Sequence, residues 1–234
     1  MTHEISLRVT GSIFIMEQIM RNIITENTAL LEALTNCAYS LHKDDLEKGA
    51  RLMAAAFHDD PSIRYLLGGQ TIGNHDWRYF LCVLKAIYGK CVMLSDREEL
   101  RSLLILFPPK LKSVPTIGFM ANGGVGLCRF FGLPLFRRSI IYENNCQRIK
   151  SRLSTPDMWY CMCLVVAPEE QGRGIGSCLI KPVLEILDKY CAPAYLETHK
   201  ERNTRIYKHL GFEIADISEI PGTGIKQYDM LRKG

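Results

Sequence analysis

The sequence predicts an α/β domain, and three observations carry this prediction. Over residues 157–234, apolar strand-like runs alternate with amphipathic helical segments, with a glycine-rich turn after the first run. A short apolar run at 100–107 stops at Pro108 and Pro109, as a buried strand does. Before it, apolar residues recur with a helical period at 43–60.

The composition is that of an ordinary globular protein of modest charge. The chain has 234 residues, of which 47% are hydrophobic and 23% charged, and its net charge is +4 at pH 7. This charge suits anionic small ligands but lacks the dense Lys/Arg stripe of a nucleic-acid binder, so we expect no nucleic-acid partner. Apolar runs stay below the about 18 residues that a membrane span needs, so we expect no membrane partner.

Nine cysteines raise the question of disulfides or a metal site. Their number is odd and they form no CxxC pair, so we expect reduced thiols and no zinc site. Reduced thiols favour a cytoplasmic location. The cluster His58, Asp59 and Asp60 lies where a helix ends before Pro61, so helix capping explains it better than a metal ion does. We therefore expect no metal cofactor.

The order of elements follows from periodicity and from turn residues. Residues 1–42 carry a weak helical period and are expected to form an N-terminal helical extension to one domain at 43–234. Within this domain we expect helices at 43–60 and 75–94, strands at 100–107 and 158–166, and a partly helical stretch at 116–153. Beyond it we expect a helix at 175–190 with Pro182 inside it, a strand at 193–198, a helix at 203–211 and a hairpin at 212–233. Asn203 is placed to cap the 203–211 helix and Gly211 to end it.

The stretch QGRGIG at 171–176 predicts an anion-binding turn. Gly172, Gly174 and Gly176 carry no Cβ, so the backbone can approach a phosphate and successive amides can point at its oxygens. The helix that follows adds its positive end, and Arg173 adds a charge that could pair with phosphate. Three glycines in five residues are entropically costly, which favours a ligand over a plain connection.

Several phosphate ligands are conceivable for this turn. A dinucleotide fingerprint needs G-x-G-x-x-G directly after its strand, but Ser177 stands at the third glycine position and APEEQ separates strand from turn. The acidic Glu197 at the end of the next strand keeps that alternative open. A nucleotide-triphosphate loop ends in Gly-Lys-Ser/Thr, and no lysine follows Gly176.

One ordered set of residues is more specific. The strand end LVV, the turn QGRGIG, the later LET, then Asn203, Tyr207 and the GF at 211–212 resemble the GNAT superfamily of acyl-CoA-dependent N-acetyltransferases. The stretches MAAAFHDDPSIRYLL, WYCMCLVVAPEEQGRGIGSCLIKPVLE and YLETHKERNTRIYKHLGFEI look like its puromycin N-acetyltransferase branch. The likeness covers about residues 43–234 and is loose between 110 and 155.

The resemblance implies a fold and a cofactor. The fold is a twisted, mixed and mostly antiparallel sheet flanked by helices and split in the middle to admit acetyl-CoA. The family's pantetheine-binding strand matches Leu164, Val165 and Val166, and Asn203 faces the same cleft. The residues that match the family's pyrophosphate turn are Gln171, Gly172, Arg173, Gly174, Ile175, Gly176 and Ser177.

The catalytic roles are also implied by the resemblance. The tyrosine that matches Tyr207 often protonates the departing thiolate as a general acid. Helical spacing alone favours Tyr207 as a wall residue. For the general base, Glu143 comes first because the branch carries a pocket glutamate near this point, followed by Glu197 and His199.

The expected activity is direct acetyl transfer from acetyl-CoA to a primary amine of a small molecule in a ternary complex. Two alternatives stay open: acetylation of protein or peptide amines, and a coenzyme-A-binding module without turnover. The sequence leaves the acceptor and the oligomeric state undetermined, with a homodimer as one expectation.

Overall fold

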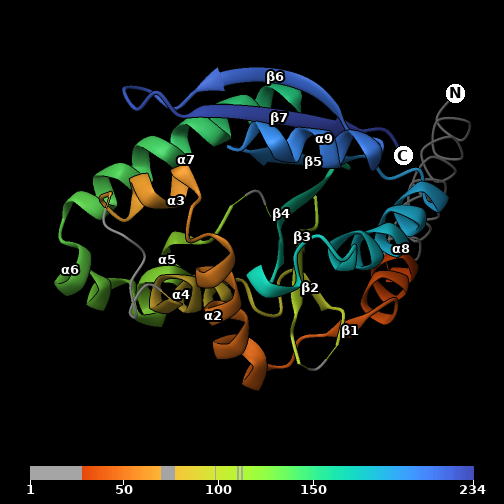
Figure 1. Cartoon of the computed structure of the whole chain (residues 1–234), viewed down its shortest axis with the longest axis horizontal. Coiled ribbons are helices and arrows are strands. Elements are labelled where there is room, and N and C mark those ends of the chain that lie inside the picture. Colours follow the sequence, from red (N-terminus) through yellow and green to blue (C-terminus); the bar gives the residue numbers. More distant parts are fainter. Residues whose placement is uncertain (1–27, 70–76, 98, 110, 112) are drawn as a thin grey trace, which may run out of the picture.

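A computed structural model describes residues 28–69, 77–97, 99–109, 111 and 113–234. It contains a seven-stranded sheet in the order β1-β2-β3-β4-β5-β7-β6 (Figure 1). The strands are β1 (Tyr39–Ser40), β2 (Val92–Ser95), β3 (Ser102–Phe107), β4 (Trp159–Val166), β5 (Ala194–Thr198), β6 (Glu213–Glu219) and β7 (Lys226–Arg232). β4 and β5 run parallel, and the other neighbouring pairs run antiparallel. The predicted mixed, mostly antiparallel sheet is confirmed.

Helices cover both faces of this sheet (Figure 1). They are α2 (Leu46–Ala56), α3 (Pro61–Leu66), α4 (Trp77–Ile87), α5 (Thr116–Phe119), α6 (Val125–Phe131), α7 (Pro134–Leu153), α8 (Ile175–Lys189) and α9 (Glu201–His209). A π-helical segment at Met120–Gly124 joins α5 to α6. No helix in the described part of the chain is long and apolar enough to cross a membrane.

The predicted helix at 75–94 is wrong in its second half. Helix α4 ends at Ile87, and Val92–Ser95 form strand β2 instead. Between them Gly89 adopts φ +72°, a left-handed conformation that stops a helix. All four residues of β2 are buried. A strand buried on both faces shows no alternation, so its apolar run looks the same as buried helix.

The N-terminal segment lies partly outside the described residues, which begin at Thr28. Residues 28–36 form a helix whose Leu34 is fully buried in the core. After it, β1 pairs antiparallel with β2 at the sheet edge. Residues 28–40 therefore pack with the domain that follows. The remainder of the predicted helical extension, residues 1–27, lies outside the described residues.

The sheet separates two apolar cores. On the side of α8, the core includes Trp159, Leu184 and Phe212. On the side of α2 and α4, it includes Phe80 and Ile105. Burial of such side chains contributes about 1.5–3 kcal/mol each and holds β3 and β4 rigidly between the two layers.

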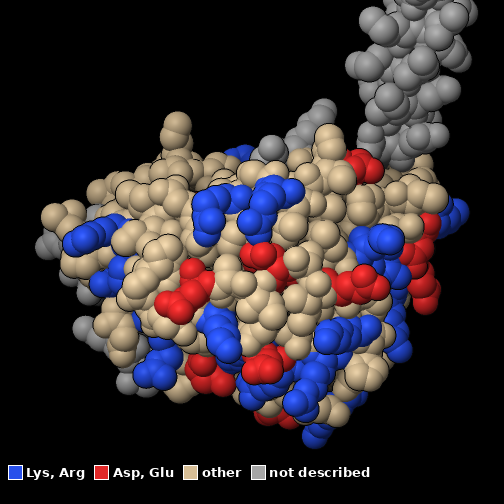
Figure 2. All heavy atoms as spheres, turned by 90° about the horizontal axis from the view of Figure 1, so that it is seen from above, with Lys and Arg blue, Asp and Glu red and all other residues tan. Residues whose placement is uncertain are grey.

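Charged side chains are mixed on the surface. Figure 2 shows Lys and Arg interspersed with Asp and Glu on the face that it presents, among wide uncharged areas. This pattern agrees with the modest net charge of +4.

Candidate functional site

The sheet opens in its middle, between β4 and β5. Their paired register is limited to Trp159 with Ala194 and Tyr160 with Tyr195. From there on, β5 pairs with β7 and β4 pairs with β3. One backbone edge of the second half of β4 is thereby released from the sheet, which leaves peptide groups free to bind a ligand.

A β-bulge lies at the point where the two strands part. Ile105 of β3 pairs with Cys163, and Leu106 pairs with Cys161, so Met162 is the extra residue on β4. The bulge interrupts the alternation of side chains along β4, so Cys161 and Cys163 point to opposite faces of the sheet. Cys161 belongs to the α8-side core, whereas Cys163 belongs to the core under α2 and α4. Such bulges re-aim peptide groups and are frequent beside active sites.

The glycine turn begins α8 next to the released edge. Gly172 has φ +79° and Gly174 has φ +77°, and Gly174 is the N-cap of α8. A Cβ on either residue would meet nothing within 4 Å, so the backbone conformation, not space, requires glycine there. Gly176 differs, because its Cβ would lie 3.0 Å from Cγ2 of Val166 on β4. The third glycine therefore packs the helix start against the strand.

The first backbone amides of α8 have no acceptor within the helix. The first helical hydrogen bond runs from the Cys178 amide to the Gly174 carbonyl at 2.9 Å. The amides of Ile175, Gly176 and Ser177 precede it and have no acceptor within the helix. Together with the positive end of the helix they form an anion-binding position.

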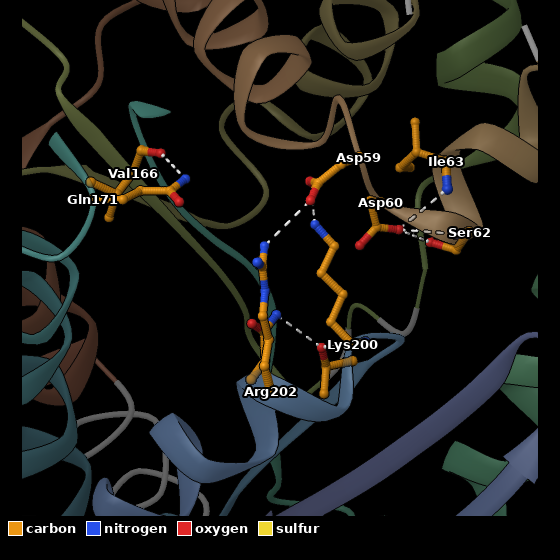
Figure 3. Close-up of polar contacts among 10 residues, drawn as sticks. Asp59, Asp60, Ser62, Ile63, Val166, Gln171, Lys200 and Arg202 are labelled. Atoms are coloured by element: carbon orange, nitrogen blue, oxygen red, sulfur yellow. Dashed lines mark hydrogen bonds and ion pairs between the residues drawn. The ribbon is translucent and has the colours of Figure 1, made fainter. Parts of the chain in front are cut away.

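Side chains of the turn are tied to the protein itself. The Gln171 side-chain amide donates to the Val166 carbonyl at 3.1 Å, which links the turn to β4 (Figure 3). Arg173 pairs with Glu170 at 3.0 Å on the surface. On β4 itself, the Val165 side chain is buried in the α2–α4 core, and Leu164 packs on the α8-side core.

Tyr207 and Asn203 lie on α9, one helical turn apart. The Tyr207 ring packs edge-on against Phe212 with 6.0 Å between ring centroids. Burial raises the pKa of Tyr207 above the ordinary range, and the thiols of Cys161 and Cys163 on β4 raise it further. The phenol is therefore protonated at neutral pH and lies beside the bulged strand.

The expected role of Asn203 as helix cap is wrong. α9 begins at Glu201 with Lys200 as N-cap, and Asn203 is already inside the first turn. Its side-chain amide donates to the Thr198 hydroxyl at 3.2 Å and so ties α9 to the end of β5. Gly211 ends the helix as predicted, with φ +84°.

A buried polar cluster lies under α7, on the face of β5 and β7. Glu197 of β5 stands directly opposite Asp229 of β7. The Tyr160 hydroxyl donates to Oε1 of Glu197. The Oε2 atom of Glu197 is buried and has no hydrogen-bond partner in the described part of the chain. Burial raises the pKa of the Glu197 carboxyl, and the charge of Lys150 is the main influence that opposes this rise.

Glu143 and His199 occupy different surroundings. Glu143, on α7, accepts a hydrogen bond from the Gln147 side-chain amide at 2.8 Å. His199 lies just after β5, with its ring 5.5 Å from that of Tyr142. Burial lowers the pKa of His199, so the ring is neutral at pH 7.

The His58–Asp60 cluster does cap a helix, but at the start of α3 and not, as predicted, at the end of the preceding helix, because α2 already ends at Ala56. Asp60 is the N-cap of α3 and accepts from the amides of Ser62 and Ile63 at 3.0 and 3.3 Å (Figure 3). Asp59 forms ion pairs with Lys200 and Arg202 instead. Within the residues that the structure describes, no group of three potential ligands is arranged to hold a metal ion.

Sequence reasoning missed two members of the buried cluster, Lys150 and Asp229. Lys150 lies in the last turn of a long polar helix, where a lysine ordinarily faces solvent. Asp229 lies within the short stretch YDML of β7, between Tyr228 and Met230, at a position that is fully buried. A lone acidic residue among the large apolar side chains of the predicted hairpin was the available signal.

Three comparisons place this geometry among known proteins. Residues 137–214 match the family model of the acetyltransferase (GNAT) domain. An uncharacterized N-acetyltransferase of Schizosaccharomyces pombe is 35% identical over 183 residues, which cover 72% of this chain and 70% of the relative.

The solved structures agree in fold. A Corynebacterium glutamicum structure described as histone acetyltransferase HPA2 and related acetyltransferase has a TM-score of 0.58 at 16% identity, over 82% of this chain and 93% of the other. A Drosophila melanogaster polyamine N-acetyltransferase, which forms N-acetylagmatine, has a TM-score of 0.50 at 12% identity, over 83% and 97%. At 16% and 12% identity, these two similarities show a shared fold only.

Proposed function

The chain belongs to the GNAT family of N-acetyltransferases, which use acetyl-CoA as co-substrate, and we propose that it acetylates a primary amine of a small molecule. The observation that carries this proposal is the parting of β4 from β5 beside the glycine turn. A released strand edge and a helix N-terminus together suit a long ligand with one amide-rich arm and one pyrophosphate.

The proposed cofactor contacts follow from this arrangement. The amides of the turn, from Gly172 to Ser177, would hold the pyrophosphate, with Gln171 fixing the turn to the Val166 carbonyl. The edge of β4 at Leu164–Val166 would hydrogen-bond the pantetheine arm. The open space in front of Gly172 and Gly174 supports this assignment, because a bound phosphate could approach the backbone there. Asn203 would support the cofactor side of the cleft from α9.

The proposed reaction is direct acetyl transfer within a ternary complex. The amine nitrogen forms a bond to the acetyl carbon and the carbon–sulfur bond breaks. The ammonium gives one proton to a carboxylate before the attack, and Tyr207 donates its phenol proton to the departing thiolate. The nitrogen loses a second proton as the intermediate collapses to the amide, and this proton restores the Tyr207 phenol. Backbone amides near the Met162 bulge would stabilise the oxyanion of the tetrahedral intermediate.

Two carboxylates are candidates for the base, Glu143 and Glu197. The geometry favours Glu197, since its Oε1 atom is held by Tyr160 while its buried Oε2 atom has no partner in the described structure. Such a carboxylate is fixed in position and keeps one oxygen for a proton. Glu143 has one oxygen engaged by Gln147 on the same helix.

The position of Glu197 also favours a small acceptor. An amine must reach a carboxylate whose Oε2 atom is buried and whose pKa is raised by burial. A flexible small molecule meets this requirement more readily than a protein segment does. The Drosophila polyamine N-acetyltransferase supplies the matching precedent of a small amine.

Thermal unfolding with and without acetyl-CoA tests the proposal first, with NAD and ATP as controls. A ligand at about 100 times its Kd adds about 2.7 kcal/mol of stability. For a domain of this size, this corresponds to a rise of roughly 5–10 °C. Release of free thiol from acetyl-CoA with agmatine, tryptamine or puromycin would then separate an enzyme from a binding module. No stabilisation by acetyl-CoA would refute the proposal.

A further inference from the structure

Lys150 is a buried lysine without an ion pair. It lies in the last turn of α7 and is 7% exposed. In the described part of the chain, no carboxylate oxygen comes within 4 Å of its ammonium nitrogen. Lysines are rarely buried without a partner, so this placement requires a reason.

The reason lies in the ring beneath it. The Nζ atom of Lys150 is 3.8 Å from the centroid of the Tyr160 ring, and 5.9 Å from that of Tyr195. A cation on the face of an aromatic ring is attracted by the ring's electron density. The hydroxyl of the same Tyr160 ring donates to Oε1 of Glu197. The ammonium therefore lies over the face of the ring, and the carboxylate lies at its hydroxyl edge.

The carboxylates of this cluster need a positive charge. Glu197 and Asp229 face each other across β5 and β7 and repel one another when both are ionised. Asp229 is already engaged, because its Oδ1 atom accepts hydrogen bonds from Tyr195 and from Gln227. Burial disfavours the ionised form of both acids, and Lys150 is the cation that acts most strongly on Glu197.

A direct ion pair would serve a base poorly. An ammonium bonded to the Glu197 carboxylate would occupy the oxygen that must accept a proton. Held over the face of the Tyr160 ring, the same charge stabilises the carboxylate without bonding to it and leaves Oε2 without a partner in the described structure.

We propose that Lys150 is a positioning residue for Glu197: its ammonium, held on the Tyr160 ring, compensates the buried carboxylate while one carboxylate oxygen stays free for the acceptor's proton. This inference rests on the proposed function, in which Glu197 is the base. It assigns a role to a residue on α7 that the fold alone does not require.

Other titratable groups face Glu197 and enter any pH dependence. They are Tyr142 and Cys146 on α7, Tyr160 and Cys161 on β4, Tyr195 on β5, Tyr207 on α9 and Asp229 on β7. Burial raises the pKa of the phenols and thiols, so they stay neutral near pH 7. Asp229 is the one member of this group that can also change charge on the acid side.

The test is a titration of Glu197 in the full-length protein. Carbon-13 NMR of labelled glutamate carboxyls would follow its midpoint, with Glu197→Gln assigning the signal. In Lys150→Met we expect this midpoint to rise by about one to two pH units, as loss of a neighbouring opposite charge does. The acid limb of the turnover–pH profile should rise by the same amount. Lys150→Arg, which keeps a cation over the ring, should stay near wild type.

Lys189→Met is the matched control, because Lys189 also lies near a tyrosine ring, that of Tyr190, but on the exposed side of α8. It should change neither readout. If Lys150→Met unfolds the protein, the double variant with Glu197→Gln should restore folding, since it removes the uncompensated carboxylate.

An unmoved Glu197 midpoint, or a loss of turnover without a shift of the acid limb, would overturn the inference. Failure of the proposed function would show differently, as a wild-type protein that releases no thiol with agmatine, tryptamine or puromycin. In that case, the Glu197 midpoint in wild type and in Lys150→Met still shows whether the Lys150 charge acts on the Glu197 carboxylate.

Discussion

Lys200 at the start of α9 donates a hydrogen bond to the Asp59 carboxylate, 141 residues away on the loop between α2 and α3. Arg202 adds a longer contact of 3.4 Å to the same carboxylate (Figure 3). Beyond Tyr160, β4 and β5 are no longer paired, so this ion pair connects the two halves of the fold by side chains. Lys200 follows Glu197, the proposed base, by three residues, so we expect this ion pair to border the acceptor's approach.

Replacing Asp59 by Asn should loosen this connection at little cost in stability. Because the Asp59 side chain is 60% exposed, we expect a loss of about 0.2–1 kcal/mol in the free energy of unfolding. We expect a larger change, several-fold, in KM for the amine than for acetyl-CoA. Steady-state kinetics and urea unfolding at pH 7 measure both.

The pH dependence of this variant has a definite sign. The hydrogen bond from Lys200 lowers the pKa of Asp59, so its contribution is present above the unfolded pKa and is lost as the pH falls through the folded value. The stability difference between wild type and variant should therefore shrink below about pH 4. Asp157→Asn, at an exposed aspartate, is the control. A difference that persists at low pH would argue against the ion pair.

Alanine at Gly172 or Gly174 should weaken acetyl-CoA binding. Both residues have positive φ, which costs an alanine roughly 1–2 kcal/mol, and both belong to the proposed pyrophosphate turn. We expect a lower melting temperature together with a Kd for acetyl-CoA at least about tenfold higher, which corresponds to about 1.4 kcal/mol. Isothermal titration and thermal unfolding would show both effects.

Gly222→Ala is the control that distinguishes the cost of backbone strain from a loss of acetyl-CoA binding. Gly222 has φ +73°, and its Cβ would also meet nothing within 4 Å, but it lies in the turn between β6 and β7. It should lose similar stability and keep its affinity for acetyl-CoA. Equal affinity losses in all three variants would remove the turn from the binding site.

The parts of this fold that the sequence predicts are the local ones. The glycine turn, the strands at Trp159–Val166 and Ala194–Thr198 and the hairpin of β6 and β7 follow from patterns within a few residues. The branch likeness to puromycin N-acetyltransferases stays a prediction. The comparisons confirm the broader GNAT assignment.

The parts that could not be predicted depend on register between distant strands. That Glu197 faces Asp229, that β4 leaves β5 after Tyr160, and that Lys150 lies over the Tyr160 ring are consequences of tertiary packing. Periodicity places each side chain on a face but does not say which neighbour that face meets. Candidate bases were therefore identifiable from the sequence, but their surroundings were not.

Tyr207→Phe should lower kcat by about 10²-fold or more while the Kd for acetyl-CoA stays nearly constant. The change removes one hydroxyl and leaves the edge-on packing on Phe212 intact, so stability should change little. Because the pKa of Tyr207 is raised by burial, its loss should not create or remove an alkaline limb near pH 8. Tyr190→Phe, at the end of α8, is the control. Unchanged turnover would exclude Tyr207 from the proton transfer.

Glu197→Gln and Glu143→Gln together distinguish the two carboxylate candidates for the base. Glutamine keeps the shape of each side chain and can still accept a hydrogen bond from Tyr160 or from Gln147, respectively. We expect Glu197→Gln to lower kcat by about 10²–10⁴-fold and to abolish the acid limb of the pH profile, because the group that must be ionised is gone. The Glu143→Gln variant should retain most of the activity, and its pH profile should keep the acid limb.

The reverse pattern would assign the base to Glu143. The acid limb itself carries further information. Burial raises the pKa of Glu197, so its limb should lie above the ordinary glutamate range, whereas an exposed carboxyl would titrate near pH 4.3. Since activity requires the ionised form, turnover should rise with pH through this raised value. A limb at the ordinary value in the wild-type enzyme would contradict Glu197 as the base, even if its replacement slows the reaction.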